Sequence, residues 1–117
     1  MDAAITKRMI TTAEYHQMGE VGIIGHDERV ELIKGEIFNR SSKGIRHSNV
    51  LRNLTRWLYR NFDSSFEISV QSPIALDEFN EPEPDLALLS SDVDHYSSEH
   101  PNASDTALII EPVVLIN

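Results

Sequence analysis

The chain has 117 residues, 40% hydrophobic and 25% charged, which is the composition of one globular domain with a single modest core. It contains no cysteine, so disulfides, zinc–thiolate sites and cysteine nucleophiles are excluded. The net charge of −9 argues against the broad basic surface that binds nucleic acid without a metal. Neither a signal peptide nor a membrane span is recognisable, so we expect a cytoplasmic protein without a membrane partner.

The first half of the chain predicts a short helix followed by a β-hairpin. Thr11 and Glu14 have the spacing of a capping box, so a helix is expected over residues 11–18. Residues 19–27 contain three glycines and are expected to form a loop. Residues 29–33 and 36–38 predict two strands joined across Lys34 and Gly35, where glycine permits the positive φ of a tight turn.

The strongest helical pattern covers residues 47–62, and short strands follow it. The apolar residues recur at helical spacing on one face: Val50, Leu51, Leu54, Trp57, Leu58 and Phe62. Strands are expected over residues 66–71, 74–76, 85–89 and 107–111, with an extended proline-rich segment at 81–84 that cannot be a central strand. Because helices and strands do not alternate regularly, we predict an α+β fold with a mixed sheet and one helix on its face.

Three acidic residues lie on or beside apolar runs that predict buried strands: Glu31, Asp85 and Glu111. A carboxylate in such a place is costly unless it is compensated, and a divalent cation is a common compensation. If the three converge, they predict a Mg²⁺ site. Each also has a structural interpretation: Asp85 as a solvated residue at a strand entrance, Glu111 as a charge returning to solvent at a strand end, and Glu31 as an ion-pair partner of Arg29 or Lys34.

Two further residues are candidates for a supporting role. His47 stands near the start of the long helix, where it could bind a phosphate or join a metal shell, or be an ordinary helix-start residue. Gln71 and Glu67 share one side of a predicted strand, and either could orient a metal-bound water. No phosphate-binding glycine loop, zinc-protease motif or serine-hydrolase motif is recognisable.

Taken in chain order, five features resemble those of the Uma2 family, also described as domain of unknown function 820. They are MITTAEYHQM, RVELIKGEIFNRSS, the histidine at the start of the long helix, VQSPIALDEFNEPEPDLALL and ALIIE. Each feature is weak alone, but their order and gaps cover nearly the whole chain. Uma2 proteins belong to the PD-(D/E)XK nuclease-like superfamily. The resemblance therefore implies one domain over residues 1–117 with a restriction-endonuclease-like core.

The resemblance also implies roles for the acidic residues. Asp85 and Glu111 would hold Mg²⁺ or Mn²⁺ beside a scissile phosphate, with Glu31 as an additional catalytic acid. The expected partner is nucleic acid, DNA in the first instance. A homodimer is a candidate assembly, because many nucleases of this superfamily pair to cut both strands.

The end of the chain departs from the family pattern. The catalytic lysine expected after the Glu111 strand has no counterpart, and the sequence stops six residues after Glu111 in an apolar stretch that follows Pro112. We therefore expect a core that is incomplete at its C-terminus, truncated after the Glu111 strand, with impaired or absent cleavage. The alternatives are a non-catalytic remnant or protein-interaction module, and a small α+β binding protein of another kind.

Overall fold

The computed structural model describes residues 4–40, 44–62, 64–92 and 94–112, and it has an α+β fold, as predicted. The apolar tail at 113–117, on which the expectation of a truncated core depends, lies outside these residues. In chain order the elements are α1 (Thr12–Glu20), β1 (Val30–Ile33), β2 (Glu36–Asn39), α2 (Ile45–Asn61), β3 (Phe66–Val70), β4 (Leu86–Ser90), the 3₁₀ turn η1 (Ala103–Asp105) and β5 (Thr106–Ile110). Among the described residues, no helix combines the length and apolar character that a bilayer crossing requires.

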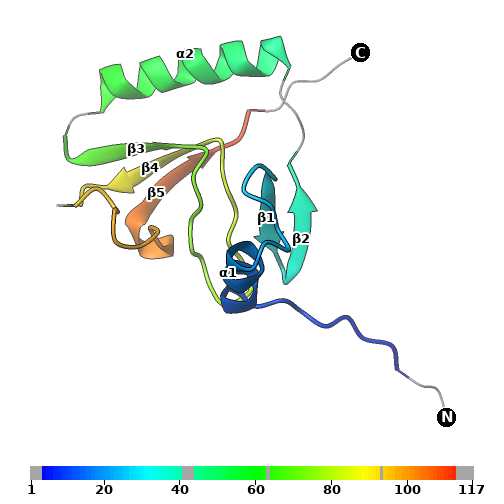
Figure 1. The fold of residues 1–117 in the computed structure, drawn as a ribbon. Coiled ribbons are helices and arrows are strands. Elements are labelled where there is room, and N and C mark those ends of the chain that lie inside the picture. Colours follow the sequence, from blue (N-terminus) through cyan, green and yellow to red (C-terminus); the bar gives the residue numbers. More distant parts are fainter. Residues whose placement is uncertain (1–3, 41–43, 63, 93, 113–117) are drawn as a thin grey trace.

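Helix α1 and the β1–β2 hairpin form one end of the molecule (Figure 1). The predicted capping box is present, since Thr11 and Glu14 each bond the other residue's backbone N–H. The hairpin turns at Lys34 and Gly35, with φ values of 50° and 71°. A Cβ at Gly35 would lie 2.6 Å from the Cβ of Met9, so both the turn and this close approach require glycine.

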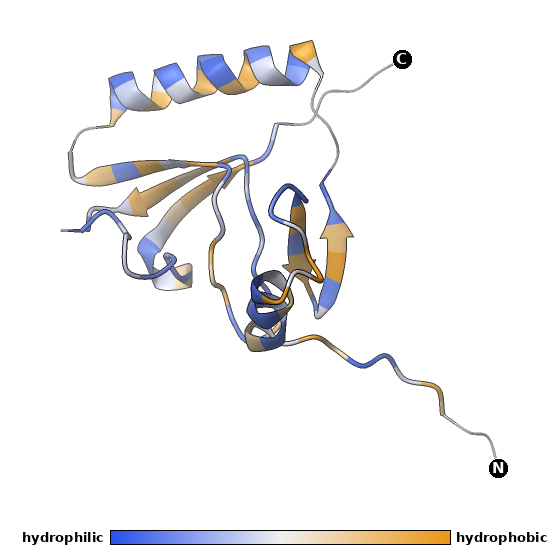
Figure 2. Ribbon diagram, in the orientation of Figure 1, coloured by the Kyte–Doolittle hydropathy of each residue, from blue (hydrophilic) through white to orange (hydrophobic). Residues whose placement is uncertain are grey.

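Strands β3, β4 and β5 form a second sheet with β4 in the middle, and α2 covers one of its faces (Figure 1). Most of the apolar side of α2 is turned toward the sheet, and its outer side is largely hydrophilic (Figure 2). Leu51 and Leu58 of α2 pack with Leu86 of β4 in a buried cluster. All paired strands are antiparallel, which corrects the prediction of a mixed sheet. An isolated bridge between Ala75 and Asn102 is parallel.

The segment between β3 and β4 links the two sheets. Its residue Glu81 forms a bridge with Leu32 of β1, with N···O distances of 3.2 and 2.8 Å between the two backbones. The predicted strand at 74–76 is wrong, because these residues make only isolated bonds. The N–H of Ile74 donates to the carbonyl of Pro82 at 2.9 Å. Pro82 and Pro84 have no N–H to return, so no ladder can form between these segments.

Candidate functional site

Asp85 is buried at the entrance to β4. The residue is 5% exposed, and it directly precedes Leu86, which is completely buried. Its carbonyl accepts a hydrogen bond of 3.0 Å from the N–H of Gln71, which has left β3 with a positive φ of 50°. The interpretation of Asp85 as a solvated strand-entry residue is therefore wrong. Burial of a carboxylate requires compensation, and the side chains around it provide this.

Arg40 joins Glu31 to Asp85. Its Nη1 lies 3.2 Å from Glu31 Oε2, and its Nη2 lies 2.9 Å from Asp85 Oδ1. Glu31 faces Phe38 across the hairpin, so Arg40, two residues further on, is its diagonal neighbour on the same face. The N–H of Glu83 also donates to Glu31 Oε2, at 3.0 Å. The sequence offered Arg29 or Lys34 as the ion-pair partner of Glu31, and the structure assigns that place to Arg40.

His47 completes this group, which we name the Asp85 cluster (Glu31, Arg40, His47 and Asp85). His47 is the third residue of α2, and its Nε2 lies 3.2 Å from Asp85 Oδ2. Two nitrogens of the cluster, Arg40 Nε and His47 Nδ1, are buried without a hydrogen-bond partner among the described residues. An unsatisfied buried polar atom costs about 1–3 kcal/mol. Two of them in one cluster indicate a site that takes up a further polar group, such as water or an oxyanion.

Glu111 follows β5 and is exposed. Leu86 of β4 pairs with Ile110 of β5, so the antiparallel register continued by one residue sets Glu111 opposite Asp85. The structure thus brings Glu31, His47 and Asp85 into one contact network, and it places Glu111 at the neighbouring register position. Gln71 is held at Asp85 through its backbone. Glu67 lies at the other end of β3, where it contacts His95 at 2.8 Å.

The donor set of these residues fits a hard divalent cation. Carboxylate oxygens are the ligands that Mg²⁺ and Mn²⁺ prefer, and Glu31, Asp85 and Glu111 supply them from three different segments. In this structure the Arg40 guanidinium supplies the positive charge between Glu31 and Asp85. A cation bound by those two carboxylates would take over this compensation. Arg40, whose planar fork suits phosphate as well as carboxylate, would then be available to an anionic ligand.

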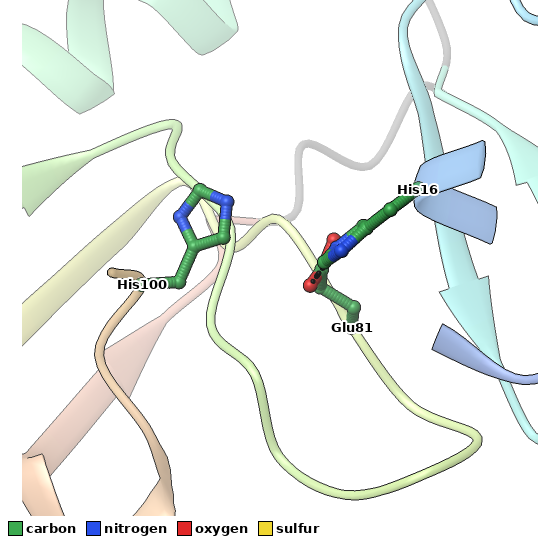
Figure 3. A group of neighbouring side chains, drawn as sticks. All are labelled: His16, Glu81 and His100. Atoms are coloured by element: carbon green, nitrogen blue, oxygen red, sulfur yellow. Dashed lines mark hydrogen bonds and ion pairs between the residues drawn. The ribbon is translucent and has the colours of Figure 1, made fainter. Parts of the chain in front are cut away.

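A second group of ionisable side chains lies near the first and was missed by the sequence reasoning. We name it the His16 group: His16 of α1, Glu81 between β3 and β4, and His100 in the loop that follows β4 (Figure 3). His16 Nε2 lies 2.7 Å from Glu81 Oε1, and one donor atom from each of the three residues lies within 4.8 Å of the other two. No local spacing motif joins these positions, so only the folded chain reveals the group.

Tyr15 lies close to carboxylates of both groups, Glu31 and Glu81. Its hydroxyl donates to the carbonyl of Val30 at 3.2 Å. Burial raises the pKa of Tyr15 to about 12, and the carboxylates of Glu81, Glu83 and Glu31 add to this effect. Both effects raise the pKa, because burial and neighbouring carboxylates each disfavour the charged phenolate. The same local potential attracts cations.

A helix packed on an antiparallel sheet, with a buried acidic cluster where β4 begins, is consistent with the restriction-endonuclease-like class. The Uma2 family model, described as "Putative restriction endonuclease", matches residues 12–114. The chain therefore belongs to the Uma2 family, which confirms the resemblance found in its sequence. This membership supports a nuclease-like function at the level of the family. A search of the curated proteins finds no match.

Proposed function

We propose that the chain is a metal-dependent endonuclease domain of the kind that hydrolyses phosphodiester bonds in nucleic acid, DNA in the first instance. Its cleavage is expected to be impaired, because the catalytic lysine implied by the family resemblance has no counterpart in residues 112–117. Asp85 and Glu111 would hold Mg²⁺ or Mn²⁺, with Glu31 as the additional acid. One observation carries the proposal: Glu31 and Asp85, far apart in the sequence, meet at a single arginine. The register of β4 and β5 adds Glu111 beside Asp85.

Each residue of the Asp85 cluster has a role in this proposal. When bound, the metal supplies a water of lowered pKa and positive charge near the scissile phosphate. Arg40 contributes a fixed guanidinium whose buried Nε still lacks a partner, so a phosphate oxygen would satisfy it. His47 holds Asp85 in place through its Nε2, and Gln71 supports Asp85 through its backbone N–H.

Electrostatics sets where a polyanion can approach. The overall charge of −9 is unfavourable for DNA, but seven of the ten Lys and Arg residues lie between Lys34 and Arg60. This stretch includes the exposed face of α2 and adjoins the Asp85 cluster. Binding would depend strongly on salt, because it would rest on these few cations and the metal. The proposal includes a cytoplasmic location. It also includes a homodimer on the substrate, and sedimentation with and without DNA would test this assembly.

The direct test is cleavage of supercoiled plasmid DNA with Mg²⁺, Mn²⁺ or EDTA. Nicking that requires either metal and is lost in Asp85→Asn and in Glu111→Gln supports the proposal. Glu99→Gln is the matched control for Glu111→Gln, because it removes an exposed carboxylate from the loop between β4 and β5. Circular dichroism establishes that each variant is folded. Nicking that persists in folded Asp85→Asn would contradict the assigned role of this residue.

A second candidate is a protein-interaction module that does not cleave. The observation in its favour is that Arg40 already neutralises Glu31 and Asp85, so the cluster is compensated without a metal. Strand β5 also leaves Leu108 and Ile109 more than two-fifths exposed, as a docking strand would. A folded wild-type chain that cleaves neither DNA nor RNA with Mg²⁺ or Mn²⁺ would favour this alternative over the nuclease.

A further inference from the structure

The His16 group brings together two imidazoles and one carboxylate that the Asp85 cluster does not use. They come from α1, from the segment before β4 and from the loop after β4. In Figure 3 the His16 ring and the Glu81 carboxylate meet, and His100 lies to the left of both. The rings of His16 and His100 are separated by 6.2 Å between centroids.

The backbone holds each member of the group in place. Glu81 is bonded through both its N–H and its carbonyl to Leu32, which is completely buried. His100 precedes Pro101, a buried residue whose carbonyl accepts a bond of 2.8 Å from the N–H of Ala75. His16 lies in a helix with a complete capping box. These hydrogen bonds hold the backbone around the three residues, while the two exposed imidazoles keep rotational freedom.

Burial and charge at this place favour a cation. Glu81 is 4% exposed, whereas the His16 side chain is 49% exposed. A buried carboxylate that relies on a half-exposed imidazole is compensated only weakly when that imidazole is neutral. A divalent cation would compensate Glu81 more completely than His16 does.

The donor types select the class of metal. Two imidazole nitrogens with one carboxylate oxygen is a set that Zn²⁺ uses, whereas Mg²⁺ and Ca²⁺ prefer oxygen ligands alone. In a tetrahedral site with bonds near 2.0–2.1 Å, donor atoms lie about 3.3 Å apart. The present separations, 2.7 Å for one pair and up to 4.8 Å for the others, bracket that value. Because both rings are exposed, rotation of the imidazoles can close the remaining difference.

We propose that His16, Glu81 and His100 form a zinc-binding site of three protein ligands, with solvent as the fourth. The site is separate from the Asp85 cluster and takes a different class of metal. Bound zinc would tie α1 and the loop after β4 to the segment that carries Asp85. Its consequence is stabilisation of that end of the fold, because a ligand that binds only the folded chain raises its stability.

Isothermal titration with ZnCl₂, after removal of metal with a chelator, tests the proposal. We expect one equivalent of zinc to bind. We also expect zinc to raise the melting temperature, followed by the fluorescence of the single tryptophan, Trp57. Even the loss of a supporting residue costs a metal site about 10–100-fold in affinity, so His100→Ala and His16→Ala should each weaken binding at least tenfold. His26→Ala, which removes an exposed imidazole from another loop, should bind zinc as the wild type does.

Further variants separate this site from the proposed nuclease site. Glu111→Gln should leave zinc binding unchanged, whereas Glu81→Gln should weaken it. Co²⁺ in place of zinc should give the absorption of a four-coordinate site with nitrogen ligands, lost in His100→Ala. Absence of a stoichiometric zinc site in the folded wild type would overturn the proposal. Wild-type affinity in His100→Ala would overturn it as well, because His16 and Glu81 would then be only an ion pair.

Discussion

Replacement of Arg40 by methionine tests whether this residue is the compensating charge of the Asp85 cluster. Methionine keeps much of the apolar stem but removes the guanidinium that contacts Glu31 and Asp85 at 3.2 and 2.9 Å. The arginine and aspartate side chains are 10% and 7% exposed, so the remaining charges would be largely desolvated. Removal of one partner from a buried ion pair costs about 3–5 kcal/mol. Because Glu31 is 22% exposed, we expect the lower end, about 3 kcal/mol.

The assay is urea unfolding followed by the fluorescence of Trp57, with Arg52→Met as the control. Arg52 is exposed on α2, and its replacement should change stability by less than about 0.5 kcal/mol. A loss of about 3 kcal/mol in Arg40→Met would lower the melting temperature by roughly 10 °C in a domain of this size. Mg²⁺ should restore part of the loss, because it can replace the missing charge. If Arg40→Met is as stable as Arg52→Met, the compensation argument is refuted.

Three further predictions concern the frame around the site. Leu86→Ala, at a completely buried position, should cost about 3 kcal/mol in urea unfolding. Gly35→Ala should lower the free energy of unfolding by more than about 1 kcal/mol, because the φ of this residue is +71° and the new Cβ would collide with a neighbouring side chain. Gly19→Ala is the control and should not destabilise the fold, because nothing lies within 4 Å of its new Cβ. The Arg8 guanidinium is the main cause that lowers the pKa of Glu14 to about 2. This carboxylate's contribution to stability is therefore present above pH 4.5 and lost as the pH falls toward 2, which NMR titration of its carboxyl group would show.

The sequence predicted an element correctly where interactions between residues close in sequence determine its structure. The capping box at Thr11, the turn at Lys34 and Gly35, and the apolar face of α2 all depend on neighbours within a few residues. The predicted strand at 74–76 was wrong because strand formation also depends on the opposite segment. There Pro82 has no N–H to donate, so the hydrogen bonds of a ladder cannot form. Pairing direction also depends on distant partners, and the mixed sheet was wrong for that reason.

The site could be predicted in part for the same reason. Glu31, His47 and Asp85 stood out because each is a polar residue beside an apolar pattern, and the structure brings them together. Arg40 was missed as the link, although its diagonal place across the hairpin from Glu31 follows from the register. His16, Glu81 and His100 gave no such signal. Their convergence depends on how α1 and two loops pack, which no spacing in the chain encodes.

Titration of the metal-free chain with Mn²⁺ by calorimetry tests the central claim most directly, because it asks whether Asp85 and Glu111 share one ion. We predict one equivalent in the wild type, with binding lost in Asp85→Asn and equally in Glu111→Gln, and with Glu99→Gln as the unchanged control. Loss of Mn²⁺ binding in both variants requires one site formed by the neighbouring ends of β4 and β5, as the register of these strands predicts. Unchanged Mn²⁺ binding in folded Asp85→Asn and Glu111→Gln would contradict the proposed metal site.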